Sequence, residues 1–236
     1  MMDFSAGFKS FSEVSTPAEG SYLKPWNIYK GVKFGGVSDP STGNKKDGGT
    51  WKAWDFTFEC EDGVYRERIF EPTTLERGKY NDKELPSDFE RSQCFIAQVM
   101  SVYNPTGFEK LKALTNEGKI KTFDQFIEVV KKLLAKPVQP TADNDIQLKL
   151  CGRKTQDGKV YARLTNCAIG QDGKPFMSAF LGKKLSFSAW EEGEKKKYES
   201  ASPSDPEASK PITTDIDTSP TSGDDDIDFD KELGIN

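Results

Sequence analysis

Residues 50–60, Thr-Trp-Lys-Ala-Trp-Asp-Phe-Thr-Phe-Glu-Cys, carry the clearest secondary-structure signal in the chain. Apolar side chains recur at every second position, at Trp54, Phe56, Phe58 and Cys60. A period of two is typical of a strand with one face in the core. The turn at 61–63, Glu-Asp-Gly, leads to a second strand predicted at 64–71, so we expect an antiparallel hairpin.

Further strands and a helical block flank this hairpin. A strand is predicted at 26–37, before a loop at 38–49 that is rich in Gly, Asp, Asn and Lys. A helical block spans about 86–137, where two capping signals, Ser87 with Glu90 and Thr122 with Gln125, each precede apolar residues at helical spacing. Strands are then predicted at 146–151, 160–169, 176–181 and 185–190, and residues 191–197 are the polar exit from the last one.

The order of these elements indicates the fold class. Three strands, then helices, then two or more strands is the order of the OB-fold, a five-stranded Greek-key barrel that binds oligonucleotides on one face. We predict a mainly β domain over residues 21–198, an OB-fold-like Greek-key barrel with the helical insertion, about 86–137, between strands 3 and 4. An α+β domain built from two antiparallel sheets is the alternative.

The two ends of the chain differ from this body. Residues 1–20 form an N-terminal arm in which Phe4, Phe8 and Phe11 give a short apolar face. The arm either packs on the body or binds a neighbouring subunit, which would make the protein a homo-oligomer. Residues 199–236 are acidic and rich in Pro, Ser and Thr. They contain too little apolar surface to offset the entropy of folding, so we expect a disordered acidic C-terminal tail.

Charge separates the tail from the body. The tail holds eleven Asp and Glu against two Lys, a net charge of −9, whereas the whole chain carries −5. The body is therefore mildly basic, at about +4. The densest acidic run also contains two apolar residues, and it consists of Asp224, Asp225, Asp226, Ile227, Asp228 and Phe229. Such a run suits an apolar pocket rimmed with Lys and Arg on a partner, although it could fold back on the body or serve only solubility.

This acidic tip resembles that of bacterial and phage single-stranded-DNA-binding proteins, whose tails end in Asp-Asp-Asp-Ile-Pro-Phe. The resemblance implies that Asp224, Asp225, Asp226, Ile227 and Phe229 recruit replication, recombination and repair proteins, and that the tail competes with DNA for the body. Asp228 stands where that family has Pro, and residues 231–236 follow, so Phe229 lacks a terminal carboxylate. In the body, the resemblance rests on the order of elements over residues 26–190.

Composition argues against several other classes. The chain has no histidine, and its carboxylates form no spaced pairs in an apolar context, so we expect no enzyme activity, no cofactor and no metal. The four cysteines form no C-x-x-C pair and are expected to be buried free thiols: Cys60, Cys94, Cys151 and Cys167. With neither an apolar run of eighteen residues nor a signal-peptide pattern, we expect a cytoplasmic protein, in the host bacterium if a phage encodes it.

Single-stranded nucleic acid needs aromatic rings on which bases stack and cations that follow the phosphates. Both are interleaved in the predicted strands. The candidates are Trp26, Tyr29, Lys30, Lys33, Phe34, Trp51, Lys52, Tyr65, Arg66, Arg68, Lys149, Arg153, Lys154, Lys159, Tyr161 and Arg163. In the trio Lys159, Tyr161 and Arg163, the alternation places a ring between two cations on one face. For each, the alternative is structural, a core aromatic or a solvated cation.

The loop at 43–49, Gly-Asn-Lys-Lys-Asp-Gly-Gly, is a further candidate. It lacks the spacing of a phosphate-binding P-loop. Lys45 and Lys46 could instead close over a bound strand, because OB-folds use this loop for ligand contact. An ordinary hairpin loop is the alternative.

These features favour a single-stranded-DNA-binding protein. We expect it to coat DNA without strong sequence preference during replication or recombination, and to recruit partners through its acidic tail. One alternative is a phage assembly, scaffold or chaperone-type protein, in which the tail is the functional part and the strand aromatics are core. The other is a metal-dependent nuclease.

Overall fold

The computed structural model describes residues 22–45, 48–155 and 158–201. The strands are β1 (Asn27–Tyr29), β2 (Lys33–Val37), β3 (Ser41–Asn44), β4 (Thr50–Cys60), β5 (Gly63–Phe70), β6 (Gly78–Tyr80), β7 (Lys83–Leu85), β8 (Gln147–Lys154), β9 (Val160–Arg163), β10 (Cys167–Ile169), β11 (Pro175–Met177) and β12 (Leu181–Gly182). The helices are α2 (Asp88–Tyr103), α3 (Pro105–Asn116), α4 (Phe123–Leu133) and α5 (Ala189–Ala201). The predicted arm at 1–20, the acidic tip and Lys46 lie outside the described residues.

The larger sheet is built around β4, whose bounds match the strand predicted at 50–60. One edge of β4 pairs antiparallel with β3 and β2. The other edge pairs antiparallel with the full length of β5. The alternation seen in the sequence sets the two faces, because Trp54, Phe56 and Phe58 are at most 2% exposed. The predicted hairpin and its core face are therefore confirmed.

The smaller sheet is built around β8, which pairs with β1, β9 and β12. Residues 27–44 thus contribute to both sheets, β1 to the smaller and β2 and β3 to the larger. Two separate hairpins, β6–β7 and β10–β11, complete the strands. The described strands do not close into a barrel, so the structure shows a β-rich domain with a helical insertion, and the Greek-key barrel remains a prediction.

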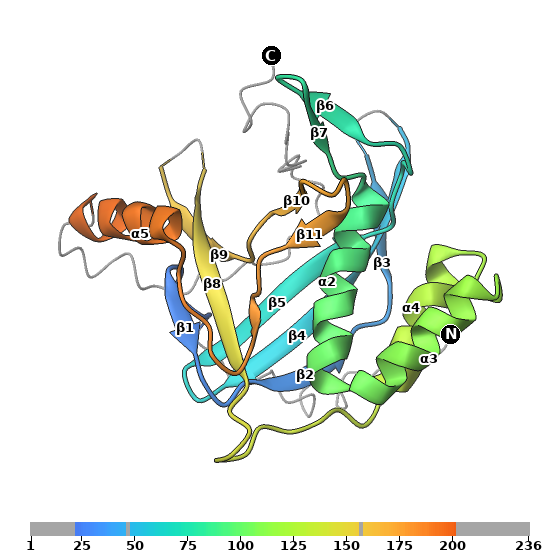
Figure 1. Ribbon diagram of the computed structural model, residues 1–236, viewed down its shortest axis with the longest axis horizontal. Helices are drawn as coiled ribbons and strands as arrows, with labels where there is room; N and C mark the ends of the chain where they lie inside the picture. The colour runs from blue at the N-terminus through green and yellow to red at the C-terminus, as the bar shows by residue number, and fades with distance from the viewer. Residues whose placement is uncertain (1–21, 46–47, 156–157, 202–236) are drawn as a thin grey trace, which may run out of the picture.

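The helical insertion falls within the predicted bounds and covers the inner face of the larger sheet (Figure 1). In α2, the Phe95 ring meets Phe56 edge-on at 5.0 Å and stacks on Phe180 at 5.5 Å. Both predicted caps form: Ser87 and Glu90 exchange hydrogen bonds, and Thr122 accepts from the Gln125 backbone N–H. The caps therefore fix the first residues of α2 and α4.

The C-terminal part of the domain corrects the sequence analysis. The predicted strand at 185–190 and the polar exit at 191–197 are wrong, because α5 occupies residues 189–201. Ser188 and Glu191 exchange hydrogen bonds of 2.7 and 3.3 Å in the pattern of a capping box, which starts the helix. The last helical residues, 199–201, lie inside the tail that we predicted to be disordered. The strand β3 and the hairpin β6–β7 were also missed.

Candidate nucleic-acid interface

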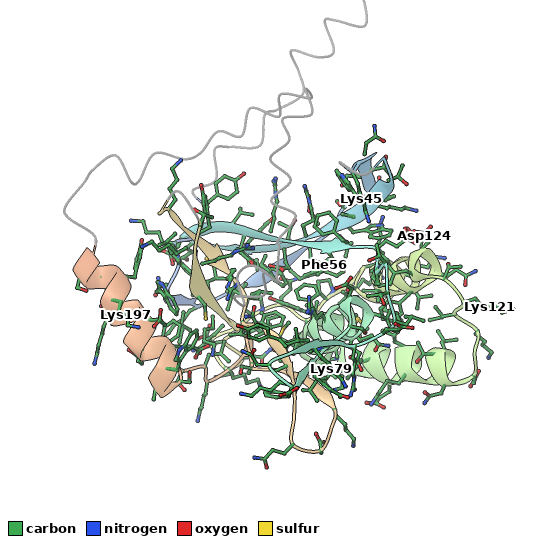
Figure 2. All side chains as sticks on the ribbon, turned by 90° about the horizontal axis from the view of Figure 1, so that it is seen from above. Lys45, Phe56, Lys79, Lys121, Asp124 and Lys197 are labelled. Atoms are coloured by element: carbon green, nitrogen blue, oxygen red, sulfur yellow. The ribbon has the colours of Figure 1, made fainter. Side chains whose placement is uncertain are left out.

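The strand β5 divides its residues between core and surface. Tyr65 and Ile69 are buried on the helix side, whereas Arg66, Arg68 and Phe70 are exposed on the opposite face. Alternate residues of a strand lie about 7 Å apart, so these three side chains form a line along one face. The line is open to solvent because the helices pack on the other side of the sheet (Figure 2).

An exposed aromatic residue stands at each end of this line. Tyr22 forms an isolated parallel bridge with Val64 at the start of β5, and the Leu23 N–H donates to the Val64 carbonyl at 3.3 Å. Tyr22 is 54% exposed and Phe70 is 48% exposed, so both rings can be reached by a ligand. We call Tyr22, Arg66, Arg68 and Phe70 the β5 stripe.

Trp51 extends the aromatic surface at the Phe70 end. The two rings meet edge-on with centroids 5.8 Å apart. Trp51 lies opposite Gly43 in β3, where a Cβ atom would come within 2.4 Å of its ring. Glycine at 43 therefore allows the indole to lie against the neighbouring strand. Lys45, half-buried, follows β3 at the tip of the same hairpin.

The cations of the stripe differ in how they are paired. Arg68 makes two hydrogen bonds to the Asp55 carboxylate, at 2.8 and 3.0 Å, and this contact raises the pKa of Arg68. Arg66 is exposed opposite Thr57 and makes no ion pair within the described residues. Lys33, also predicted as a contact, lies on the same face opposite Glu59. Arg66 is thus the cation best placed to meet a phosphate.

The β8–β9 hairpin brings further predicted residues together. Arg153 lies directly opposite Tyr161, which is 39% exposed, and Lys154 lies opposite Val160. Lys159 is exposed beside them. Figure 2 shows this hairpin and the β3–β4 tip, marked by Lys45, at opposite ends of the larger sheet.

The predicted trio Lys159, Tyr161 and Arg163 does not form one exposed surface. Arg163 is partly buried, whereas Tyr161 and Lys159 are exposed. Glu67 lies on the inner side of β5, where it accepts a hydrogen bond from the Tyr65 hydroxyl. Burial raises the pKa of Glu67 to about 7 in spite of Arg163.

Three predicted aromatic contacts are core residues. Trp26, Tyr29 and Phe34 are at most 7% exposed, so none of these rings is open to a base. Trp26 packs beside Phe187, with centroids 6.3 Å apart, and its indole nitrogen fills the space above Gly152. The Tyr29 hydroxyl donates to the Lys24 carbonyl. Tyr65, named with Arg66 and Arg68, is buried as well.

Two predicted cations serve the fold. Lys149 is 4% exposed, and its Nζ lies 2.9 and 3.0 Å from the two carboxylate oxygens of Glu191 in α5. Lys52 points to the helix side, where it pairs with Asp124 and lies over the Trp54 ring. Lys30 is exposed in the turn between β1 and β2, outside the stripe.

Sequence reasoning missed the two aromatic ends of the stripe. Phe70 continues the alternation of Arg66 and Arg68, so that signal was present in the sequence. Tyr22 joins the stripe through one isolated bridge, for which no local pattern exists. Its position is a tertiary feature.

Comparisons with known proteins give no match to this chain among protein-family models, curated proteins or solved structures. No helix within the described residues is long and apolar enough to span a bilayer.

Proposed function

We propose that the protein binds single-stranded DNA along the β5 stripe and coats it without strong sequence preference. The observation that carries this proposal is the arrangement of two exposed rings, Tyr22 and Phe70, with Arg66 and Arg68 between them on one strand face. Base stacking on a ring is worth about 1–3 kcal/mol per base and tolerates every base. The arginines contact phosphates, which carry no sequence information.

We extend the proposal to an OB-type fold. Residues 27–44 supply strands to both sheets, as the first strand of a Greek-key barrel does, and the three helices α2, α3 and α4 lie between β7 and β8 in the sequence. OB-folds bind oligonucleotides on the face of their second and third strands and on two flanking loops. In this chain these are β4–β5, the β3–β4 tip and the β8–β9 hairpin. The correspondence of the stripe and both basic hairpins with the positions that an OB-type fold uses for binding supports the proposal.

The acidic tail completes the proposed function. Through Asp224, Asp225, Asp226, Ile227 and Phe229 it recruits replication or recombination proteins. Its net charge of −9 opposes a body of about +4, so removing it favours the approach of a polyanion. The proposed site of action is the cytoplasm of a bacterial host.

The rival function is a phage assembly, scaffold or chaperone-type protein. If this function is right, the aromatic residues of the strands belong to the core. The burial of Trp26, Tyr29 and Phe34 agrees with it. It gives no reason for an aromatic and arginine line on the open face of β5.

One binding experiment separates the two functions. The full chain and a version ending at Ala201, where α5 ends, are titrated with single- and double-stranded oligonucleotides at two salt concentrations. We expect selective binding of the single strand, weaker binding at the higher salt through counterion release, and tighter binding by the shorter version. Absence of binding by both versions would favour the assembly protein.

A further inference from the structure

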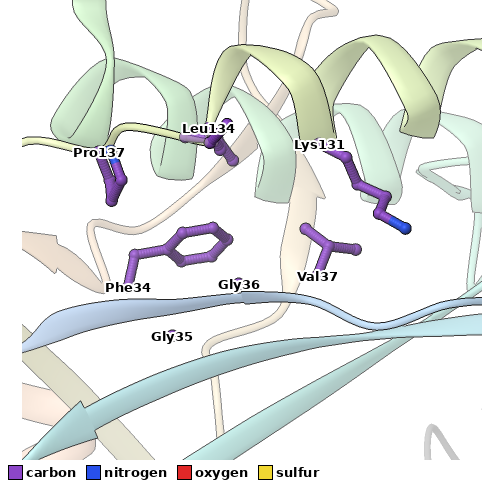
Figure 3. A pocket seen from close by; sticks show the side chains of 8 residues that line it. Phe34, Gly35, Gly36, Val37, Lys131, Leu134 and Pro137 are labelled. Atoms are coloured by element: carbon purple, nitrogen blue, oxygen red, sulfur yellow. The ribbon is translucent and has the colours of Figure 1, made fainter.

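The helix side of the larger sheet has a small pocket of about 210 Å³ between β2 and α4 (Figure 3). Figure 3 shows Phe34 rising from β2 towards Leu134, which follows α4, and both side chains are buried. Lys131 is the one charged residue that lines the pocket, and its Nζ lies 2.8 Å from Asp39 and 3.9 Å from Glu128. Because this charge is already matched, we assign no ligand to the pocket.

A pair of cysteines lies where α2 meets the β10–β11 hairpin (Figure 1). Cys94 belongs to α2, Cys167 begins β10, and their side chains are hydrogen-bonded to each other. Gln98, one turn further along α2, donates a hydrogen bond of 2.9 Å to the carbonyl of Met177. Met177 is the residue that pairs with Cys167 in the hairpin. The packing of the hairpin on α2 therefore brings the two thiols together.

The other two cysteines have different surroundings. Cys151 is 5% exposed, and its thiol donates to the Glu191 carboxylate at 3.4 Å. Burial raises the pKa of Cys151 to about 12. Cys60 ends β4, and partial burial raises its pKa as well. Both thiols therefore stay protonated at neutral pH and react slowly, because the thiolate is the nucleophile.

The pair is open to small molecules and contains the more acidic thiol. Cys94 and Cys167 are both only half-buried. The hydrogen bond from Cys167 lowers the pKa of Cys94, and the same bond raises the pKa of Cys167. Cys94 thus ionises first and keeps a second thiol beside it. Redox-active cysteines have this arrangement, in which an accessible thiolate lies next to the thiol that resolves its adduct.

We propose that Cys94 and Cys167 form a modification site for small disulfides of the class of glutathione disulfide, which convert the pair into an intramolecular disulfide. The Cys94 thiolate attacks one sulfur of the small disulfide, forms a mixed disulfide and releases one thiolate. Cys167 passes its proton to that thiolate and attacks the Cys94 sulfur, and the second thiolate leaves and takes up the proton that Cys94 gave to the solvent. Two protein thiols are oxidised by two electrons, and the small disulfide is reduced to two thiols.

The fold can accommodate the bond. The sulfur atoms of a disulfide lie about 2.0 Å apart, so β10 must move towards α2. Within the described residues β10 pairs only with β11, and this hairpin is separate from both main sheets. Side-chain hydrogen bonds hold it, among them those of Gln98 and the bond of 3.0 Å from Arg77 to the Gly173 carbonyl. The hairpin can therefore move without breaking the pairing of either main sheet.

The bond would fix the hairpin on the helical insertion. It closes a loop that contains α3, α4, β8 and β9, and this restricts the unfolded chain and raises stability. Disulfides of cytoplasmic proteins are usually transient, so in the proposed location the bond would form only when small disulfides accumulate. The helix α2 lies on the helix side of the larger sheet, opposite the β5 stripe. The modification site is therefore independent of DNA binding.

The test treats the folded full chain with glutathione disulfide and follows it by intact-mass spectrometry. Wild type should lose the mass of two hydrogen atoms, and peptide mapping without reductant should find Cys94 joined to Cys167. Cys167→Ser should stop with one glutathione on Cys94, because no second thiol resolves the adduct. Cys94→Ser should react at least several-fold more slowly. Cys60→Ser, the matched control at a half-buried cysteine outside the pair, should behave as wild type. The oxidised wild type should also unfold at a higher temperature than the reduced protein.

Three outcomes would overturn the proposal. A wild type that keeps one bound glutathione, as Cys167→Ser does, would show that the two thiols cannot join. Modification of Cys60 or Cys151 before Cys94 would show that the pair is not the reactive site. No reaction of the folded chain, with full reaction of the same chain in urea, would show that the fold shields both thiols.

Discussion

The strands β5 and β8 both carry cations that we predicted to contact phosphates, yet these cations have different surroundings. In β5, Arg66 and Arg68 project to solvent on the open face of the larger sheet. In β8, Lys149 is covered by α5 and paired with Glu191, which is itself only 5% exposed. The sequences of the two strands predict the same role, phosphate contact, for all three residues. The position of a cation in a strand indicates on which face of the sheet its side chain lies. It does not indicate whether another element covers that face.

Removal of Lys149 should destabilise the fold more than any change on the β5 stripe. Lys149→Met leaves the Glu191 carboxylate buried without a counter-charge, so we expect the free energy of unfolding to fall by about 3–5 kcal/mol in urea denaturation. Adding Glu191→Gln, which can keep the hydrogen bond to the Ser188 backbone, should recover much of the loss. Lys154→Ala, an exposed residue of the same strand, should stay within about 0.5 kcal/mol of wild type. If the Lys149→Met variant is as stable as wild type but binds oligonucleotides more weakly, Lys149 contacts the nucleic acid after all.

The aromatic end of the stripe should give the next largest effect. Phe70→Ala removes a stacking platform, and we expect oligothymidylate affinity to fall by about 1–3 kcal/mol while stability changes little. Phe176→Ala is the matched control, because Phe176 is 50% exposed on β11, away from the stripe. Equal losses in the two variants would mean that exposed rings in general, and not the stripe, contact the strand.

Glu67, on the inner side of β5, should make the stability of the protein depend on pH. Burial raises the pKa of Glu67 from 4.5 to about 7 in the folded protein. Between these values the unfolded chain has already released the proton, so the stability that the raised pKa contributes is present at low pH and is lost as pH rises to about 7. Relative to Glu67→Gln, wild type should lose stability over this range and then level off. A flat difference between wild type and Glu67→Gln over this range would contradict the raised pKa.

The comparison also shows what a sequence can predict. The hairpin β4–β5, the helical insertion and two helix caps were predicted because each rests on local periodicity or on contacts within a few residues. The burial of Lys149 was not, because it depends on α5, whose residues were assigned to the end of a strand, its polar exit and the start of the tail. Ser188 and Glu191 have the spacing of a capping box. This pair predicts a helix after residue 188, and that helix covers β8.

The stripe itself was half predicted. Arg66 and Arg68 were identified as cations of a predicted strand, and Phe70 follows at the same spacing, but Trp26, Tyr29 and Phe34 were proposed as contacts when they are core. In a small domain most aromatic residues of strands are needed to fill the interior. An aromatic residue in a predicted strand is therefore more often a core residue than a contact to a base. Tyr22 required the tertiary bridge to Val64.

The central claim is that a single strand of DNA lies along the β5 stripe, and Arg66 tests it most directly. Affinity for oligothymidylate is measured at several salt concentrations for the full chain, for Arg66→Ala and for Lys79→Ala, an exposed lysine of β6. If Arg66 meets one phosphate, the slope of log affinity against log salt should be shallower by about 0.7 in Arg66→Ala and unchanged in Lys79→Ala. Identical slopes in all three proteins would contradict the claim and place the strand elsewhere.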